Sequence, residues 1–162
     1  MLALSTDKPD TWTMSKPDIV VERLETYSEA DAAGIGRLMP FLSERLNNEP
    51  MAEDVLRAIV ESPHHDQLVA KLDGLIVGAA TMNLLMGPGV NKQGYLEDFV
   101  TDPKYRGQGI GDRVWQAMID WCKEQEVDLS FTSNPSREEA HRFYLNHGAE
   151  IRDTNAFHMS VE

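Results

Sequence analysis

Three glycines at alternate positions join a predicted strand to the most regular helical pattern in the sequence. This junction limits the possible folds more than any other feature. Residues 95–101 have a strand pattern that Asp102-Pro103 ends, and the glycines follow in Arg106-Gly-Gln-Gly-Ile-Gly111. From Ile110, apolar residues recur at i, i+4, i+7, i+8, i+11 and i+12, which predicts an amphipathic helix packed against a larger body. Backbone amides left unpaired at a helix N-terminus, with the helix dipole behind them, predict an anion-binding site.

Residue identities exclude two other phosphate-binding loops. The nucleoside-triphosphate loop ends in Gly-Lys-Ser/Thr, whereas Gly111 is followed by Asp112 and Arg113. The dinucleotide-binding fingerprint needs a glycine at position 112 and normally follows the first strand of a domain. A glycine-rich turn that binds nothing is the alternative interpretation.

The rest of the sequence alternates between strand and helix patterns, which predicts one domain over residues 18–162 with a mixed α/β sheet. Asp73-Gly74 predicts a hairpin turn and residues 87–94 a loop, while Ser136 with Glu139 predicts a capping box for a helix that Gly148 ends. Residues 1–17 are polar and are expected to be disordered. The predicted strands are 19–21, 67–71, 75–85, 95–101, 127–132 and 156–161, and the helices before the glycine-rich turn are 29–45 and 51–60.

The chain is strongly acidic: its 162 residues include 15 Lys and Arg against 27 Asp and Glu, a formal net charge of −12. Such a charge repels nucleic acid and anionic membrane surfaces, and it favours cationic small molecules or basic peptides. Cys122 is the only cysteine, which excludes an intramolecular disulfide, and no stretch approaches the roughly 18 apolar residues of a membrane span. We therefore expect a cytoplasmic protein with no nucleic-acid or membrane partner.

Two motifs resemble those of the GNAT superfamily of acyl-CoA-dependent N-acetyltransferases. The first is the glycine-rich segment 106–111, which matches the family's pyrophosphate motif, preceded as usual by a strand and Asp-Pro. The second is Asn134-Pro-Ser-Arg-Glu-Glu-Ala-His-Arg-Phe-Tyr144-Leu-Asn-His-Gly148. The resemblance covers about residues 18–162. It implies a mixed, mostly antiparallel central sheet of six to seven strands, flanked by about four helices and splayed between strands four and five.

The resemblance also implies the roles of particular residues. Amides of residues 106–111 would hold the pyrophosphate of coenzyme A, and Asn134 would hydrogen-bond its pantetheine arm, which would pair with the backbone near Phe99 and Val100. Tyr144 would be the general acid facing the sulfur, with a core aromatic as the alternative. The implied cofactor-binding residues are Phe99, Val100, Arg106, Gly107, Gln108, Gly109, Ile110, Gly111 and Asn134.

Acetyl transfer to an amine also needs a base, because an alkylamine of pKa about 10.4 is only about 0.04% neutral at pH 7. Glu97 and Asp98 are adjacent in a predicted strand, so regular alternation would turn their side chains to opposite faces. We favour Glu97 as the base, acting through a water, with Asp98 second; carboxylates in solvent or in ion pairs are the alternative. No metal is expected, because the histidines lack ligand spacing and Cys122 falls on the apolar side of its helix.

The resemblance and the acidic charge together predict an enzyme that moves acetyl from acetyl-CoA directly to a primary amine in a ternary complex. The acceptor would be a small cationic amine, such as a polyamine, or a peptide amine. Tyr95-Leu-Glu-Asp-Phe99 resembles the corresponding strand of polyamine-acetylating members, and residues 41–51 and 82–92 would line the acceptor pocket. A noncatalytic acyl-CoA-binding regulatory module is the alternative function, and a homodimer is left open.

Overall fold

The computed structural model describes residues 18–89 and 91–161. The predicted disordered tail, residues 1–17, lies outside the described residues. Contacts divide the chain into two compact units, Met1–Ser130 and Phe131–Glu162. The first unit holds the sheet with helices α1 to α3, and the second holds helix α4.

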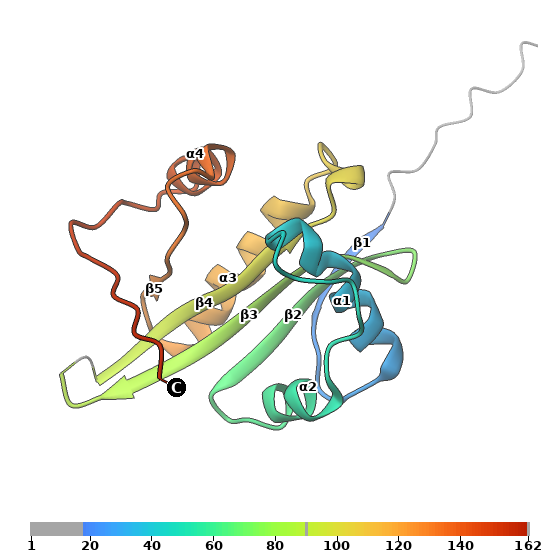
Figure 1. Cartoon of the computed structure of the whole chain (residues 1–162), viewed down its shortest axis with the longest axis horizontal. Helices are drawn as coiled ribbons and strands as arrows, with labels where there is room; N and C mark the ends of the chain where they lie inside the picture. Colours follow the sequence, from blue (N-terminus) through green and yellow to red (C-terminus); the bar gives the residue numbers. More distant parts are fainter. Residues whose placement is uncertain (1–17, 90, 162) are drawn as a thin grey trace, which may run out of the picture. The chain divides into compact units, whose positions relative to one another are not determined.

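A sheet of five strands, in the order β1-β2-β3-β4-β5, forms the centre of the first unit (Figure 1). The first four strands pair antiparallel, and β4 pairs parallel with β5. The mixed, mostly antiparallel sheet is confirmed, but the described residues form five strands instead of six to seven. The strands are β1 (Ile19–Arg23), β2 (His65–Leu72), β3 (Leu75–Gly87), β4 (Asn91–Thr101) and β5 (Leu129–Ser130).

The predicted last strand, residues 156–161, is wrong, because residues 149–161 form neither helix nor strand. Phe157, Met159 and Val161 alternate as in a strand, yet they are 94%, 81% and 86% exposed. The alternation of apolar residues predicts which side chains would share a face of a strand. A strand also needs a neighbouring strand with which its backbone forms hydrogen bonds. The described part of the second unit contains no other strand.

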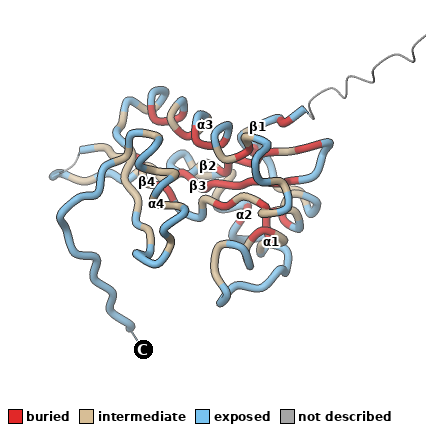
Figure 2. Tube along the Cα trace, turned by 90° about the horizontal axis from the view of Figure 1, so that it is seen from above, coloured by how far each residue is buried: buried red, intermediate tan, exposed pale blue. Residues whose placement is uncertain are grey.

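Helices cover both faces of the sheet. α1 (Glu29–Leu42) and α2 (Glu53–Val60) lie on one face, and α3 (Ile110–Gln125) lies on the other (Figure 1). The Ser28 side chain caps α1 by accepting a hydrogen bond from the Asp31 amide at 3.0 Å. Buried residues concentrate in the sheet and along the helix surfaces that face it (Figure 2).

Periodic apolar residues on α1 and α3 account for this layering. On α1, Ala32, Ile35 and Leu38 are buried in a cluster with sheet residues. On the other face, α3 packs closely at Gly78, where an added Cβ would lie 3.0 Å from the Ile110 side chain. A larger residue at position 78 would push α3 away from the sheet.

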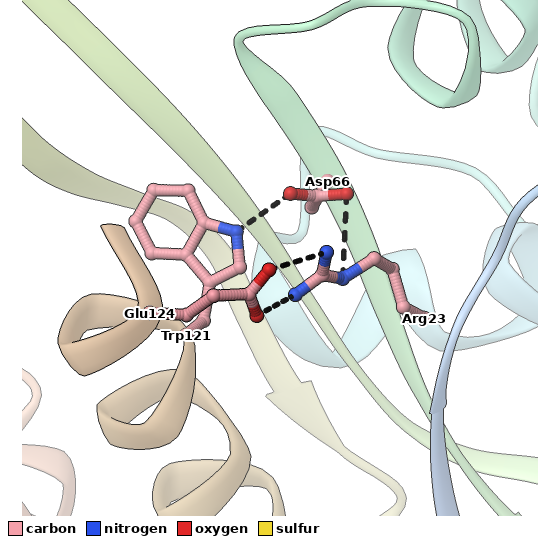
Figure 3. A network of polar contacts seen from close by, with 4 residues as sticks. All are labelled: Arg23, Asp66, Trp121 and Glu124. Carbon is pink, nitrogen blue, oxygen red and sulfur yellow. Dashed lines mark hydrogen bonds and ion pairs between the residues drawn. The ribbon is translucent and has the colours of Figure 1, made fainter.

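Polar contacts hold the C-terminal end of α3 to β1 and β2 (Figure 3). The Trp121 indole donates to Asp66 Oδ2 at 2.6 Å, and Asp66 Oδ1 lies 3.5 Å from Arg23 Nε. A second arginine nitrogen, Nη2, donates to Glu124 Oε2 at 2.7 Å. Burial of the indole together with its hydrogen bond fixes the end of the helix on the sheet.

Pairing between β3 and β4 extends both strands into the predicted loop. Residues 87–94 were predicted as a loop, but β3 continues to Gly87 and β4 begins at Asn91, with pairs from Gly87↔Asn91 to Leu84↔Gly94. Gly94 is needed there, since a Cβ would lie 3.1 Å from the Asp128 carbonyl oxygen. Strand pairing thus overrides the low strand propensity of glycine. The predicted turn at Asp73-Gly74 is confirmed by φ values of +49° and +82°.

The second unit is organised around α4 (Glu138–Asn146). Gly148 follows it with φ of +85°, as predicted for the end of this helix. The predicted capping box is wrong, because α4 has no side-chain cap and Arg137 precedes its first residue. Asn134 Oδ1 instead accepts from the amide and the hydroxyl of Ser136 at 2.9 and 2.8 Å, which holds Ser136 in a turn before the helix.

Candidate functional site

The glycine-rich turn lies between a short 3₁₀ helix, η1 (Pro103–Tyr105), and α3. Gly107 and Gly109 have φ values of +77° and +78°, in the left-handed region that side chains other than glycine rarely adopt. An added Cβ at Gly107 would meet nothing within 4 Å. Residues 106–108 of the turn are exposed, and the backbone conformation favours glycine at positions 107 and 109.

Backbone amides are available at this turn. Arg106 donates its amide to the Pro103 carbonyl at 3.3 Å, but among the described residues none accepts a hydrogen bond from the amides of Gly107, Gln108 or Gly109. The first amides of α3, beginning with Ile110, have no partner within the helix. Several N–H groups and the helix dipole thus meet at one exposed place, which suits a phosphate group.

Both ends of the turn are fixed to the sheet. Upstream, the Asp102 amide donates to the Val77 carbonyl at 2.9 Å. Downstream, Arg113 on α3 donates from Nη1 to the Ile19 carbonyl at 2.6 Å. Fixed ends reduce the ordering cost of holding a ligand on the intervening amides.

A bulge interrupts β4 just before this turn. Between the pairs Thr81↔Glu97 and Ala79↔Val100, β4 has one residue more than β3. Asp98 lies in the bulge, with φ of +47°. Because a bulge breaks the alternation of side chains, the premise that placed Glu97 and Asp98 on opposite faces fails.

A pocket of about 200 Å³ opens beside the bulge, on the α1 side of the sheet. Asp98 lines it, and Glu97 does not. The predicted segment 41–51 contributes to the walls, whereas 82–92 does not, because it pairs within the β3 and β4 hairpin. The lining residues are Ile35, Gly36, Met39, Leu46, Asn47, Glu49, Pro50, Met51, Gln67, Ala79, Thr81 and Asp98.

Gln67 and Thr81, which the sequence analysis missed, form a polar part of this lining. Gln67 is 2% exposed and Thr81 is 7% exposed. The Thr81 hydroxyl donates to Gln67 Oε1 at 3.0 Å, and Gln67 Nε2 donates to the Ala80 carbonyl at 3.1 Å. A glutamine directly before an apolar run, in Gln-Leu-Val-Ala, was the available signal.

The two carboxyl groups at the bulge have perturbed proton affinities. Partial burial raises the pKa of Asp98, although the residue as a whole, like Glu97, is exposed. Burial, and secondarily the negative charge of Asp98, raises the pKa of Glu97. A raised pKa makes a carboxylate a better proton acceptor near neutral pH.

The sheet opens beside the second half of β4. β5 pairs with β4 only at Gly94↔Leu129 and Tyr95↔Ser130, and no strand among the described residues pairs with β4 beyond Tyr95 on that edge. The splay between strands four and five stays a prediction. The predicted pantetheine partners Phe99 and Val100 lie on the part of β4 beyond the pairs with β5.

The second unit carries the remaining predicted residues. Tyr144 on α4 is half-buried, and its ring centroid lies 4.7 Å from that of Phe131. Burial raises the pKa of Tyr144, against a smaller opposing effect of Arg137, so the phenol stays protonated at neutral pH. Asn134 is exposed, and its side-chain oxygen is bonded to Ser136. Its side-chain nitrogen is the part available to a ligand.

Within residues 18–89 and 91–161, we find no side chains arranged as a metal site, no activated cysteine and no helix suited to a membrane. No group of three or more His, Cys, Asp and Glu side chains is placed to hold a metal there. Cys122 is buried, and burial raises the pKa of its thiol to about 11, so the thiol is not activated as a nucleophile. None of the helices in these ranges is both long enough and apolar enough to cross a bilayer.

Sequence relatives place these features in a family. A profile of the Acetyltransferase (GNAT) family matches residues 22–149. Thialysine N-epsilon-acetyltransferase of Mus musculus is 30% identical over an alignment of 105 residues, which covers 57% of this chain and 62% of the mouse protein. The match thus spans less than two thirds of that relative's length.

Solved structures share the fold. An aminoglycoside acetyltransferase from an uncultured soil metagenomic sample, in complex with sisomicin, has a TM-score of 0.78 at 19% identity, covering 89% of this chain and 97% of that one. A transcriptional regulator from Bacillus halodurans C-125 has a TM-score of 0.74 at 21% identity, covering 89% and 100%. The family profile covers most of the chain, including the exposed glycine-rich turn and α4, and the chain therefore belongs to the acetyltransferase (GNAT) family.

Proposed function

We propose that this protein is an N-acetyltransferase that moves acetyl from acetyl-CoA to a primary amine by direct attack in a ternary complex. The observation that carries the proposal is the exposed turn at the start of α3, with two left-handed glycines and unpaired amides. This arrangement suits a diphosphate, and the family uses one in coenzyme A. The residues that would hold it are Arg106, Gly107, Gln108, Gly109, Ile110 and Gly111.

The pocket beside Asp98 is the acceptor site in this proposal. Its lining includes apolar residues such as Ile35 and Met39 and two acidic residues, Asp98 and Glu49. Such a pocket suits an alkyl chain with an ammonium group. At about 200 Å³ it is smaller than the roughly 300–1,000 Å³ typical of sites for drug-sized ligands, which favours a small amine over a large polycyclic one.

Asp98 is the stronger candidate for the base, because it lines the pocket and its pKa is raised by burial. Freeing the lone pair of an alkylammonium at pH 7 costs about 4.6 kcal/mol. A carboxylate in direct contact with the ammonium would also stabilise the charged form, so we propose that the proton leaves through a water. Glu97, favoured from the sequence, is second, because it does not line the pocket.

Tyr144 assists the leaving thiol in this proposal. A thiol has pKa near 8.5 and a phenol near 10, so full proton transfer from Tyr144 to a thiolate is uphill by about 2 kcal/mol. Burial raises the pKa of Tyr144 and makes that transfer still less favourable. We propose that its hydroxyl acts by donating a hydrogen bond as negative charge develops on sulfur.

The proposed acceptor is a small cationic amine or a peptide amine. The net charge of −12 favours cations. The mouse relative is named for thialysine and the metagenomic one for aminoglycosides, both of which carry amino groups. Of these two types, the size of the pocket supports the short linear one.

Thiol release from acetyl-CoA, measured with a panel of amines, tests the proposal. The panel contains linear diamines and polyamines, lysine and thialysine, an aminoglycoside, and peptides with free amino groups. We expect turnover that saturates with a linear amine and is weak with the aminoglycoside. Calorimetric binding of acetyl-CoA without turnover on any amine would support the noncatalytic module instead, and absence of binding would reject both functions.

A further inference from the structure

An ion pair that the proposed mechanism does not use links α1 to the short helix that precedes the glycine-rich turn. Asp102, at the end of β4, is 4% exposed, and its Oδ2 accepts from Arg37 Nη1 at 2.6 Å. Its Oδ1 accepts from the Lys104 amide at 2.9 Å and so caps η1, the helix that leads into the turn. One carboxylate therefore holds both α1 and the start of the turn.

Arg37 is also hydrogen-bonded to the sheet. Its Nη2 donates to the Ile76 carbonyl on β3 at 2.5 Å. Arg37 belongs to α1, next to Gly36, and Gly36 and Met39 of the same helix line the pocket. The guanidinium is thus bound to the sheet and to the cap of η1, while its helix forms a wall of the pocket.

Only one partner of this pair is removed from water. The Asp102 side chain is 5% exposed, whereas that of Arg37 is 37% exposed, although its Nε is buried without a hydrogen-bond partner in the described structure. Burial acts to raise the pKa of Asp102, but the hydrogen bonds from Arg37 and from the Lys104 amide outweigh it and leave that pKa below its ordinary value. The desolvation of Asp102 and the unpaired Nε of Arg37 both offset part of what this half-buried pair contributes to stability, which leaves room for a positioning role.

We infer that Arg37 and Asp102 are positioning residues, which fix the cap of η1 and hence the glycine-rich turn relative to the α1 wall of the acceptor pocket. The inference rests on the proposed function, in which the turn holds coenzyme A and the pocket holds the amine. Neither side chain contacts the reacting atoms in this account. Their role is to keep the amides of the turn in one arrangement before the ligand arrives.

Affinity for coenzyme A, measured by calorimetry at least 15 °C below the unfolding midpoint of each variant, tests the inference. Arg37→Gln removes a positive charge, and Asp102→Asn removes a negative one while keeping the shape of the side chain. We expect each to weaken binding by at least tenfold. A general effect of charge on an anionic ligand would instead weaken binding in the first variant and strengthen it in the second.

Two further variants separate positioning from stability. Arg37→Lys keeps the charge but cannot bond Asp102 and the Ile76 carbonyl in the same fork, so we expect an intermediate loss of affinity. Arg23→Gln breaks the ion pair with Glu124 (Figure 3) and serves as the control for the loss of an arginine. We expect it to lower the unfolding midpoint without changing the affinity for coenzyme A by more than twofold.

The double variant Arg37→Gln/Asp102→Asn should bind coenzyme A no more weakly than whichever single variant has the lower affinity, because both substitutions break the same contact. In turnover assays, the single variants should raise the KM for acetyl-CoA by a larger factor than they lower kcat.

If wild type binds coenzyme A and the Arg37 and Asp102 variants bind it with an affinity within twofold of wild type, the inference is wrong and the proposed function stands. If wild type itself does not bind, the proposed function fails. Should Arg37→Gln or Asp102→Asn fail to fold, unchanged affinity in Arg37→Lys would overturn the inference.

Discussion

The glycine-rich turn and the acceptor pocket differ in what they are made of. The turn is a contiguous stretch, residues 106–111, which offers backbone amides and depends on two left-handed glycines. The pocket is assembled from α1, the segment that follows it, β2, β3 and the bulge of β4, and it offers side chains. Both are parts of the first unit and are joined through Asp102.

This difference predicts different responses to substitution. A site made of backbone amides tolerates most changes of side chain except at positions where conformation requires glycine. A site made of side chains responds to single substitutions at any wall, and its selectivity changes readily. The same fold can therefore keep one co-substrate while the acceptor varies.

The largest effect is expected from Gly109→Glu. A glutamate at φ of +78° is strained by about 1–2 kcal/mol, and its carboxylate repels a diphosphate at the same place. Each 1.4 kcal/mol is a factor of ten, so we expect the Kd for coenzyme A to rise by more than about 100-fold. Gly87→Glu, which adds the same charge where a Cβ meets nothing within 4 Å, is the matched control and should bind normally. Equal binding by Gly109→Glu and wild type would show that the turn is not the site.

Asp98→Asn should act on the pocket alone. We expect kcat/KM for the amine to fall by about 10- to 100-fold, with the Kd for coenzyme A unchanged. Because the raised pKa of Asp98 places its protonation nearer neutral pH, the wild-type rate should fall as pH decreases through that pKa, and the variant should lose this acidic limb. A larger loss in Glu97→Gln than in Asp98→Asn would return the role of base to Glu97.

Stability should change in the opposite direction to activity in Asp98→Asn. A carboxyl group whose folded pKa is raised stabilises the fold while protonated, and this contribution is lost as pH rises through the folded pKa. At neutral pH the ionised group is a cost, and asparagine also tolerates the left-handed backbone. We expect an unchanged or higher unfolding midpoint by calorimetry. A clear decrease would show that Asp98 serves the fold instead.

Tyr144→Phe should leave both binding sites intact. Loss of one hydrogen bond to developing charge, worth about 1–1.5 kcal/mol, lowers kcat by about tenfold. The Kd for acetyl-CoA should stay within twofold, since Phe keeps the ring contact with Phe131. Stopped-flow measurement of thiol release separates these quantities, and an unchanged kcat would remove Tyr144 from the mechanism.

Gly36→Ala should produce the smallest effect on activity, with a larger effect on stability. A Cβ at Gly36 would lie 1.9 Å from the Glu49 carbonyl oxygen, so the main chain of the segment that crosses α1 must shift, and we expect a clear fall in the unfolding midpoint. In the folded variant we expect the KM for the amine to rise by roughly two- to fivefold, because residues 46–51 form part of the pocket. Gly34→Ala, whose nearest neighbour is the movable Ile76 side chain, has the same helix propensity gain and serves as the control. Equal KM values in the two variants would remove the crossing segment from the acceptor site.

Local sequence patterns predicted the turn and not the pocket. The strand, the alternate glycines and the period of α3 lie within one stretch of sequence, and the helix begins at Ile110 as predicted. The bulge at Asp98 arises from the register between β4 and β3. No neighbouring residue in the sequence indicates that Asp98 adopts a left-handed backbone conformation. The regular alternation of side chains along a strand therefore could not predict that Asp98, and not Glu97, lines the pocket.

Long-range pairing also explains the other differences. Segment 87–94 looked like a loop because of its glycines, and pairing with β3 made part of it a strand. Residues 156–161 have a strand pattern but no strand partner within the described second unit. Gln67 and Thr81 form a pair only because β2 and β3 bring them opposite each other. Each outcome depends on a partner distant in sequence, which a pattern within one segment does not specify.

The central claim is that amides of residues 106–111 bind the diphosphate of coenzyme A. Titration of ¹⁵N-labelled protein, followed by amide resonances, tests it directly, with pantetheine as the ligand that lacks the diphosphate. The account predicts saturable shifts at Gly107, Gly109 and Gly111 with coenzyme A and none at these glycines with pantetheine. Saturable binding of coenzyme A that leaves these three resonances in place would contradict it.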